Sequence, residues 1–118
     1  MTDEELRQAF AAVLSRVRRD CGERELYIYG AGRGGRLLCR YLQEQQVPLA
    51  GFIDQRAQGA VEGLTVYPPT VLDPVRQYVL VSLLGAAYEV RELMLARGFT
   101  AQDCCFVYPG EHHTDDIV

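Results

Sequence analysis

The sequence lacks several features that mark whole classes of protein. It has no run of 18 apolar residues, and its first residues are acidic where a secretory signal would be basic and then apolar. Its formal net charge is −4, whereas a surface that binds nucleic acid would be basic. We therefore expect a cytoplasmic protein that neither binds nucleic acid nor associates with a membrane.

Metal-ligand spacing is missing as well. The four cysteines, at positions 21, 39, 104 and 105, include no Cys-x-x-Cys pair. Cys104 and Cys105 are adjacent, as are His112 and His113. Because neighbouring residues on a strand point to opposite faces, an adjacent pair rarely serves one metal ion. We expect reduced, structural thiols and no metal.

What is present suffices for one folded domain. Of the 118 residues, 48% are hydrophobic and 24% charged, and no repeat or low-complexity linker divides the chain. Near the N-terminus apolar residues recur at helical spacing, at positions 6, 10, 13, 14 and 17. They predict an amphipathic helix that begins after a Thr2–Glu5 capping box and ends near Cys21. The apolar stripe of this helix must cover either a sheet face or a second copy of the protein.

The rest of the chain is arranged around residues 30–35, which we call the glycine turn. An apolar strand candidate, Leu26–Tyr29, runs directly into Gly30-x-Gly32-x-x-Gly35, and helix-forming residues follow. This is the spacing of dinucleotide-binding turns. In such turns the first glycine permits the tight bend, the second lets the backbone approach a pyrophosphate, and the third lets the helix pack on the strand.

The whole glycine turn is therefore a candidate phosphate site. Free N–H groups at a helix start face an anion, and Arg33 lies where its guanidinium can pair with a phosphate. Two alternatives remain: the glycines serve packing alone, or Arg33 itself fills the crevice. We predict cofactor binding by Gly30, Gly32, Arg33, Gly34 and Gly35, whereas Arg40, further along the helix, is expected to be solvated.

An aspartate follows at the distance expected of a ribose ligand. Asp54 ends the apolar run 49–53 and lies 24 residues after Gly30, close to the roughly 20 at which an acid meets ribose hydroxyls in such folds. A carboxylate there accepts hydrogen bonds from a ribose diol and repels a 2′-phosphate. NAD is thus favoured over NADP, although Arg56, two residues later, leaves NADP as an alternative. Alternatively, Asp54 caps the turn that follows its strand.

Alternating strand and helix patterns predict an α/β domain with helices on both faces of a parallel sheet. Five strands are expected, at 25–29, 49–53, 64–66, 78–84 and 104–107, in the spatial order 3-2-1-4-5. A helix is expected at 33–45, a short one between Pro74 and Gln77, and one from Gly85 to Gly98. The loops after residues 29, 54 and 82 should then meet in one crevice.

Three pieces in register, residues 28–35, 51–54 and 79–98, resemble a known group of domains. These are the Rossmann-like nucleotide(-sugar)-binding domains of bacterial polysaccharide-biosynthesis enzymes. They are found at the N-terminus of nucleotide-sugar acetyltransferases and beside FkbM-type methyltransferases and nucleotide-sugar epimerases or dehydratases. The resemblance, over residues 25 to 108, implies that the glycines lie along the phosphates, Asp54 at the nucleoside, and Ser82 with Gly85 at the far wall.

The chain lacks the parts that carry the reactions of those enzymes. It has no left-handed β-helix repeats, no methyltransferase domain and no second half of a dehydratase. Ser82 and Tyr88 suggest a short-chain dehydrogenase, but Glu92 stands where its Tyr-x-x-x-Lys motif requires lysine. No catalytic residue is therefore expected.

The sequence thus predicts three parts: an N-terminal amphipathic helix at 1–22, a Rossmann-like domain at 23–108 and a polar tail at 109–118. The expected ligand is a nucleotide sugar or NAD(H), and the expected role is accessory to carbohydrate biosynthesis. Expected partners are a second copy in a homodimer and a carbohydrate-modifying enzyme. The alternatives are a ligand-free dimerisation module, and an NAD-dependent oxidoreductase or epimerase completed by another chain.

Overall fold

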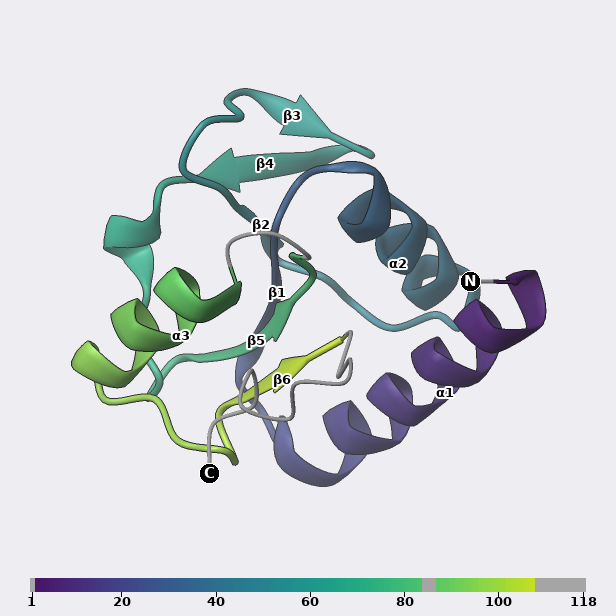
Figure 1. Cartoon of the computed structure of the whole chain (residues 1–118), viewed down its shortest axis with the longest axis horizontal. Helices are drawn as coiled ribbons and strands as arrows, with labels where there is room; N and C mark the ends of the chain where they lie inside the picture. Colours follow the sequence, from purple (N-terminus) through teal and green to yellow (C-terminus); the bar gives the residue numbers. More distant parts are fainter. Residues whose placement is uncertain (1, 84–86, 108–118) are drawn as a thin grey trace.

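The computed structural model of the chain describes residues 2–83 and 87–107 (Figure 1). The predicted polar tail at 109–118, with its two histidines, lies outside the described residues, as does Gly85. In chain order the elements are α1 (Asp3–Asp20), β1 (Glu25–Tyr29), α2 (Arg33–Glu44), β2 (Gly51–Ile53), β3 (Ala60–Val61), β4 (Leu64–Tyr67), the 3-10 helix η1 (Pro69–Val71), β5 (Gln77–Val81), α3 (Ala87–Ala96) and β6 (Cys104–Phe106).

One sheet organises these elements. Its strand order is β3-β4-β2-β1-β5-β6. Strand β1 pairs in parallel with β2 and β5, which in turn pair in parallel with β4 and β6, whereas β3 pairs antiparallel with β4. Every residue of β5 is buried, which accounts for its apolar run from Tyr78 to Val81. The prediction of an α/β domain with a mostly parallel sheet is confirmed.

The predicted count of five strands was wrong, and the order differs in that it begins with an unpredicted sixth strand, β3, at the edge of the sheet. Residues Ala60–Val61 pair with Leu64 and Thr65 across a two-residue turn. Both turn residues have positive φ, 51° for Glu62 and 79° for Gly63, as hairpin turns that match the twist of a sheet require. A strand of two residues is too short to show an alternating pattern, so only the turn glycine was visible in the sequence.

The short helix predicted before β5 was also wrong. The chain forms η1 earlier, at Pro69–Val71, and then a turn that leads directly into β5 at Gln77. The Asp73 carboxylate accepts a hydrogen bond from the Val75 N–H at 3.0 Å, and the Gln77 side-chain oxygen accepts one from the Asp73 N–H at 2.9 Å. These side chains satisfy backbone donors locally and so compete with helix formation.

Helices cover both faces of the sheet. Figure 1 shows α1 and α2 on one side and α3 on the other. Phe10, Val13, Leu14 and Val17 of α1 are between 3% and 6% exposed, in one core with Ile28 and other sheet residues. The stripe therefore covers the chain's own sheet, which is the first of the two alternatives. The homodimer itself stays a prediction.

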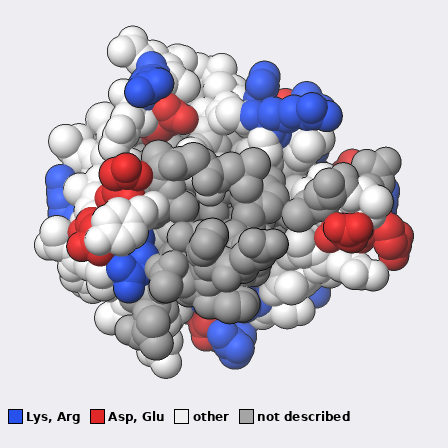
Figure 2. All heavy atoms as spheres, in the orientation of Figure 1, with Lys and Arg blue, Asp and Glu red and all other residues white. Residues whose placement is uncertain are grey.

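The N-terminal cap of α1 is as predicted, since the Thr2 hydroxyl accepts a hydrogen bond from the Glu5 N–H at 3.1 Å. Within residues 2–83 and 87–107, α1 and the other helices are either too short or too polar to cross a bilayer. Figure 2 shows basic and acidic side chains interspersed around the rim of one face. Fields of a single sign are therefore limited in the described part of this face.

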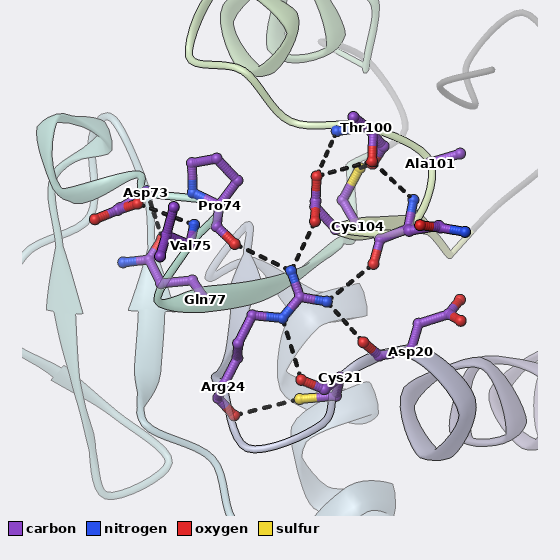
Figure 3. A network of polar contacts seen from close by, with 12 residues as sticks. Asp20, Cys21, Arg24, Asp73, Pro74, Val75, Gln77, Thr100, Ala101 and Cys104 are labelled. Carbon is purple, nitrogen blue, oxygen red and sulfur yellow. Dashed lines mark hydrogen bonds and ion pairs between the residues drawn. The ribbon is translucent and has the colours of Figure 1, made fainter.

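At the amino ends of the central strands, Arg24 contacts three segments of the chain: the end of α1, the turn before β5 and the loop before β6 (Figure 3). Its guanidinium has five N–H donors, and all of them are used. Nε donates to the Cys21 carbonyl at 3.1 Å, Nη1 to the Pro74 carbonyl at 3.0 Å and Asp103 Oδ1 at 2.7 Å, and Nη2 to the carbonyls of Asp20 at 2.6 Å and Gln102 at 3.0 Å. The same group lies 5.5 Å from the centre of the Tyr78 ring, within cation–π range.

Asp103 completes this network. Its Oδ2 accepts hydrogen bonds from the Thr100 N–H at 2.7 Å and the Thr100 hydroxyl at 2.8 Å. Burial raises the pKa of Asp103, but the Thr100 and Arg24 hydrogen bonds lower it by more, so the net pKa lies below its ordinary value. The carboxylate is thus stabilised in its ionised form.

We predict that Arg24→Lys lowers the free energy of unfolding by about 2 kcal/mol or more, since lysine cannot reproduce the planar five-donor geometry and leaves partly buried carbonyls without donors. Urea denaturation measures this. Arg18→Lys, at an exposed position of α1, is the control and should change stability by less than about 0.5 kcal/mol. Equal stability of the two variants would contradict the role given to Arg24.

We predict that Asp103 contributes to acid sensitivity. Because its pKa is lower in the folded than in the unfolded state, its contribution is present above the unfolded-state value of about 4 and is lost as pH falls through the folded-state pKa. Asp103→Asn should therefore flatten the fall in unfolding free energy between about pH 5 and pH 3, relative to the unchanged chain. Identical pH slopes would rule the contribution out.

Candidate functional site

The glycine turn lies at the carboxyl end of β1, between its two parallel neighbours. Gly30 N–H donates to the Ile53 carbonyl at the end of β2, at 2.8 Å, and Ser82 N–H donates to the Tyr29 carbonyl, also at 2.8 Å. The loops after β1, β2 and β5 therefore meet at this edge, as the predicted crevice requires.

Two of the glycines are required by the fold itself. Gly30 has a φ of 113°, and a Cβ there would lie 2.6 Å from the Ser82 carbonyl oxygen. A Cβ on Gly35 would overlap the Gly30 carbonyl oxygen. The first turn of α2 thus packs directly on the end of β1, which is the packing role predicted for Gly35.

Packing within the described part of the chain does not require glycine at position 32. Its φ of −80° and ψ of −165° are extended values that any residue adopts, and a Cβ there would find no described atom within 4 Å. The residue is exposed. Among residues 2–83 and 87–107, nothing fills the space above Gly32, at the point where a phosphate would approach the backbone.

The start of α2 presents unsatisfied N–H groups. Gly32 is its N-cap and offers no side chain. The first helical hydrogen bond runs from the Arg36 N–H to the Gly32 carbonyl, at 3.0 Å, so the N–H groups of Arg33, Gly34 and Gly35 have no partner among the described residues. These groups and the positive end of the helix dipole suit an anion.

Of the arginines at positions 33, 36 and 40, Arg33 is the one that the structure leaves available. Its side chain is exposed and makes no hydrogen bond or ion pair within the described residues. Arg36 Nε donates to the Gly32 carbonyl at 3.4 Å, and Arg40 pairs with Glu62 at 2.7 Å. Arg33 therefore does not fill the crevice by pairing with a described carboxylate.

Asp54 accepts three backbone hydrogen bonds. Its Oδ2 accepts from the Ala31 N–H at 2.9 Å, and its Oδ1 accepts from the N–H groups of Arg56 at 2.8 Å and Ala57 at 2.9 Å. Burial raises the pKa of Asp54, but these hydrogen bonds lower it by more, so the net pKa lies below its ordinary value of 3.8. The carboxylate both caps its own loop and reaches the glycine turn.

Ser82 presents a buried hydroxyl beside the glycine turn. The residue is 7% exposed, and its Oγ has no hydrogen-bond partner among the described residues. Buried hydroxyls normally form hydrogen bonds, so this group is a candidate to contact a ligand. Tyr88, in the first turn of α3, is exposed.

One component of the site, the Ala31 N–H, could not be predicted from the sequence. A backbone donor carries no side-chain signal, and alanine at this place reads only as a spacer between two glycines. The position of Asp54 at the end of β2 was the available clue. Its reach across to the glycine turn depends on the parallel pairing of Tyr29 with Ile53, which brings the two loops side by side.

The described residues contain no cluster of three or more His, Cys, Asp or Glu able to hold a metal. All four cysteines are buried. Burial raises the pKa of Cys21, and it raises that of Cys39 to about 11. These two thiols are therefore poor nucleophiles at neutral pH. What the site offers chemically is anion binding, through N–H groups and one guanidinium.

We predict opposite outcomes for alanine at two glycines of the turn. Gly35→Ala should lower the unfolding free energy by at least about 2 kcal/mol, because its methyl group overlaps the Gly30 carbonyl. Gly32→Ala should cost about 0.5 kcal/mol or less, the loss of a tolerated N-cap. Chemical denaturation of both variants tests the pair, and a large loss from Gly32→Ala would mean that its surroundings are not open.

Comparison with known proteins assigns no family to this chain. No protein-family model matches it, and no curated protein does. The resemblance to nucleotide-sugar-binding domains therefore stays a prediction, and what the protein does is inferred from the geometry of the glycine turn.

Proposed function

We propose that this is a Rossmann-like domain whose glycine turn binds the phosphates of a nucleotide sugar or of NAD(H). One observation carries the proposal: Gly32 faces a space that no described atom occupies, at an uncapped helix N-terminus. Gly30 and Gly35 are explained by packing, but Gly32 is not. A residue without a side chain at that place gives a phosphate access to the N–H groups of Arg33, Gly34 and Gly35.

The topology supports the same position. From β1 the chain crosses through α2 to β2 on one side, and β5, on the other side of β1, leads through α3 to β6. Helices α2 and α3 lie on opposite faces (Figure 1). The carboxyl ends of β1 and β5 therefore border a topological switch point, where open α/β sheets bind their ligands.

Two side chains suit a phosphate in this place. Arg33 brings an exposed guanidinium without a described partner, and guanidinium groups bind phosphate oxygens in a bidentate manner. Ser82 brings a buried hydroxyl with no described partner. Arg33 begins α2 and Ser82 follows β5, so both lie at the carboxyl edge of the sheet.

The proposed role is binding rather than catalysis. Asp54 is the carboxylate that contacts the glycine turn in the described part of the chain, and three N–H groups hold it ionised. It is therefore unsuited to act as a general acid. We propose that the domain holds its ligand in the cytoplasm for a carbohydrate-modifying enzyme, and that it does so as a homodimer.

A thermal-shift panel of UDP-glucose, NADH, NADPH and coenzyme A tests the binding. A ligand at a hundredfold excess over its dissociation constant should stabilise the fold by about 2.7 kcal/mol, a rise in Tm of roughly 10 °C. Arg33→Ala should weaken binding about tenfold through the lost charge-assisted contact. Gly32→Val should weaken it further by occupying the phosphate space.

Arg18→Ala, an exposed arginine on α1, is the matched control and should bind as the unchanged chain does. If no nucleotide shifts the Tm, or if Arg33→Ala and Arg18→Ala bind equally well and Gly32→Val has no effect, the glycine turn is not a phosphate site.

A further inference from the structure

We infer that Asp54 is a positioning residue that holds the glycine turn in its anion-binding shape and does not bind the ribose of the ligand. This inference rests on the proposed phosphate site. It changes the expected ligand class, because a site organised in this way recognises the phosphates and is indifferent to the ribose 2′ substituent.

Two successive N–H groups of the glycine turn are fixed by the end of β2. Gly30 N–H donates to the Ile53 carbonyl at 2.8 Å, and Ala31 N–H donates to Asp54 Oδ2 at 2.9 Å. The next N–H groups along the chain, from Gly32 to Gly35, are those without described partners. The bonds from β2 thus hold the backbone immediately before the groups that would meet a phosphate.

The Asp54 carboxylate has little capacity left for a ribose. A carboxylate offers about four lone-pair positions, of which Ala31, Arg56 and Ala57 use three. A diol bound to both oxygens needs two free positions, so it would have to displace a backbone donor. The bonds from Arg56 and Ala57 satisfy backbone N–H groups of the loop after β2. The bond from Ala31 satisfies a backbone N–H group of the glycine turn.

Asp54→Asn separates these roles. The amide oxygen still accepts from Arg56 and Ala57, but the amide nitrogen then faces the Ala31 N–H, donor against donor. In the full chain, we expect the variant to lose affinity for inorganic pyrophosphate, UDP and 2′-deoxy-UDP by one common factor, about tenfold. In the unchanged chain, UDP and 2′-deoxy-UDP should bind within about threefold of each other. Titration calorimetry measures each affinity.

The control is Asp73→Asn. Asp73 also accepts a backbone N–H within a turn, from Val75 at 3.0 Å, but it precedes β5 at the opposite end of the sheet. Its replacement should leave all three affinities unchanged. Amide exchange adds a readout that needs no ligand: the Ala31 N–H should lose protection in Asp54→Asn and keep it in Asp73→Asn.

The outcomes separate this inference from the proposed function. If Asp54→Asn weakens UDP but leaves pyrophosphate unchanged, or if the unchanged chain prefers UDP over 2′-deoxy-UDP by more than about tenfold, Asp54 binds ribose and the inference fails alone. If the unchanged chain binds none of the three, the proposed function fails and this inference with it. Should Asp54→Asn not fold, the comparison of UDP, 2′-deoxy-UDP and pyrophosphate on the unchanged chain still decides.

Discussion

The guanidinium of Arg24 is the group on which the arrangement of this fold most depends. It follows α1 and precedes β1, and its five N–H donors meet the end of α1, the turn before β5 and the loop before β6. Carbonyls at helix ends and in turns have no partners of their own. One charged side chain satisfies several of them at once, so the amino ends of the central strands are tied together by a single residue.

At the carboxyl ends of the same strands, a carboxylate, that of Asp54, links the loops. Asp54 accepts backbone N–H groups there, as Arg24 donates to backbone carbonyls at the other end. The two ends differ in the number of N–H donors that remain unused. Arg24 has no donor to spare, whereas the glycine turn beside Asp54 keeps N–H groups without described partners. One end of the sheet is closed by its own residues, and the other has backbone donors available to a ligand.

Sequence patterns predicted the elements whose signal is periodic or conformational. The apolar run before the glycine turn and the stripe of α1 fixed β1 and the first helix to within a residue or two, and Gly98, with a φ of 89°, ends α3 as expected. Long-range polar contacts left no such signal. Arg24 reads as one arginine among twelve, and nothing nearby in the sequence indicates that Asp103, 79 positions later, is its partner. Asp54 was predicted by position, and its bonds from Arg56 and Ala57 are those of the local turn cap considered there, but the bond from Ala31 depends on strand pairing that the sequence does not show.

The two edges of the sheet carry a further consequence. At one edge, β3 has only two residues, and the Arg40–Glu62 pair links its turn to α2. At the other, Arg16 of α1 donates to the Cys104 carbonyl of β6 at 3.3 Å. Exposed strand edges are templates on which other chains add strands and aggregate. Here one edge ends in a strand of two residues, and at the other the Arg16 guanidinium binds a carbonyl of β6, so each edge offers an added strand fewer free backbone groups.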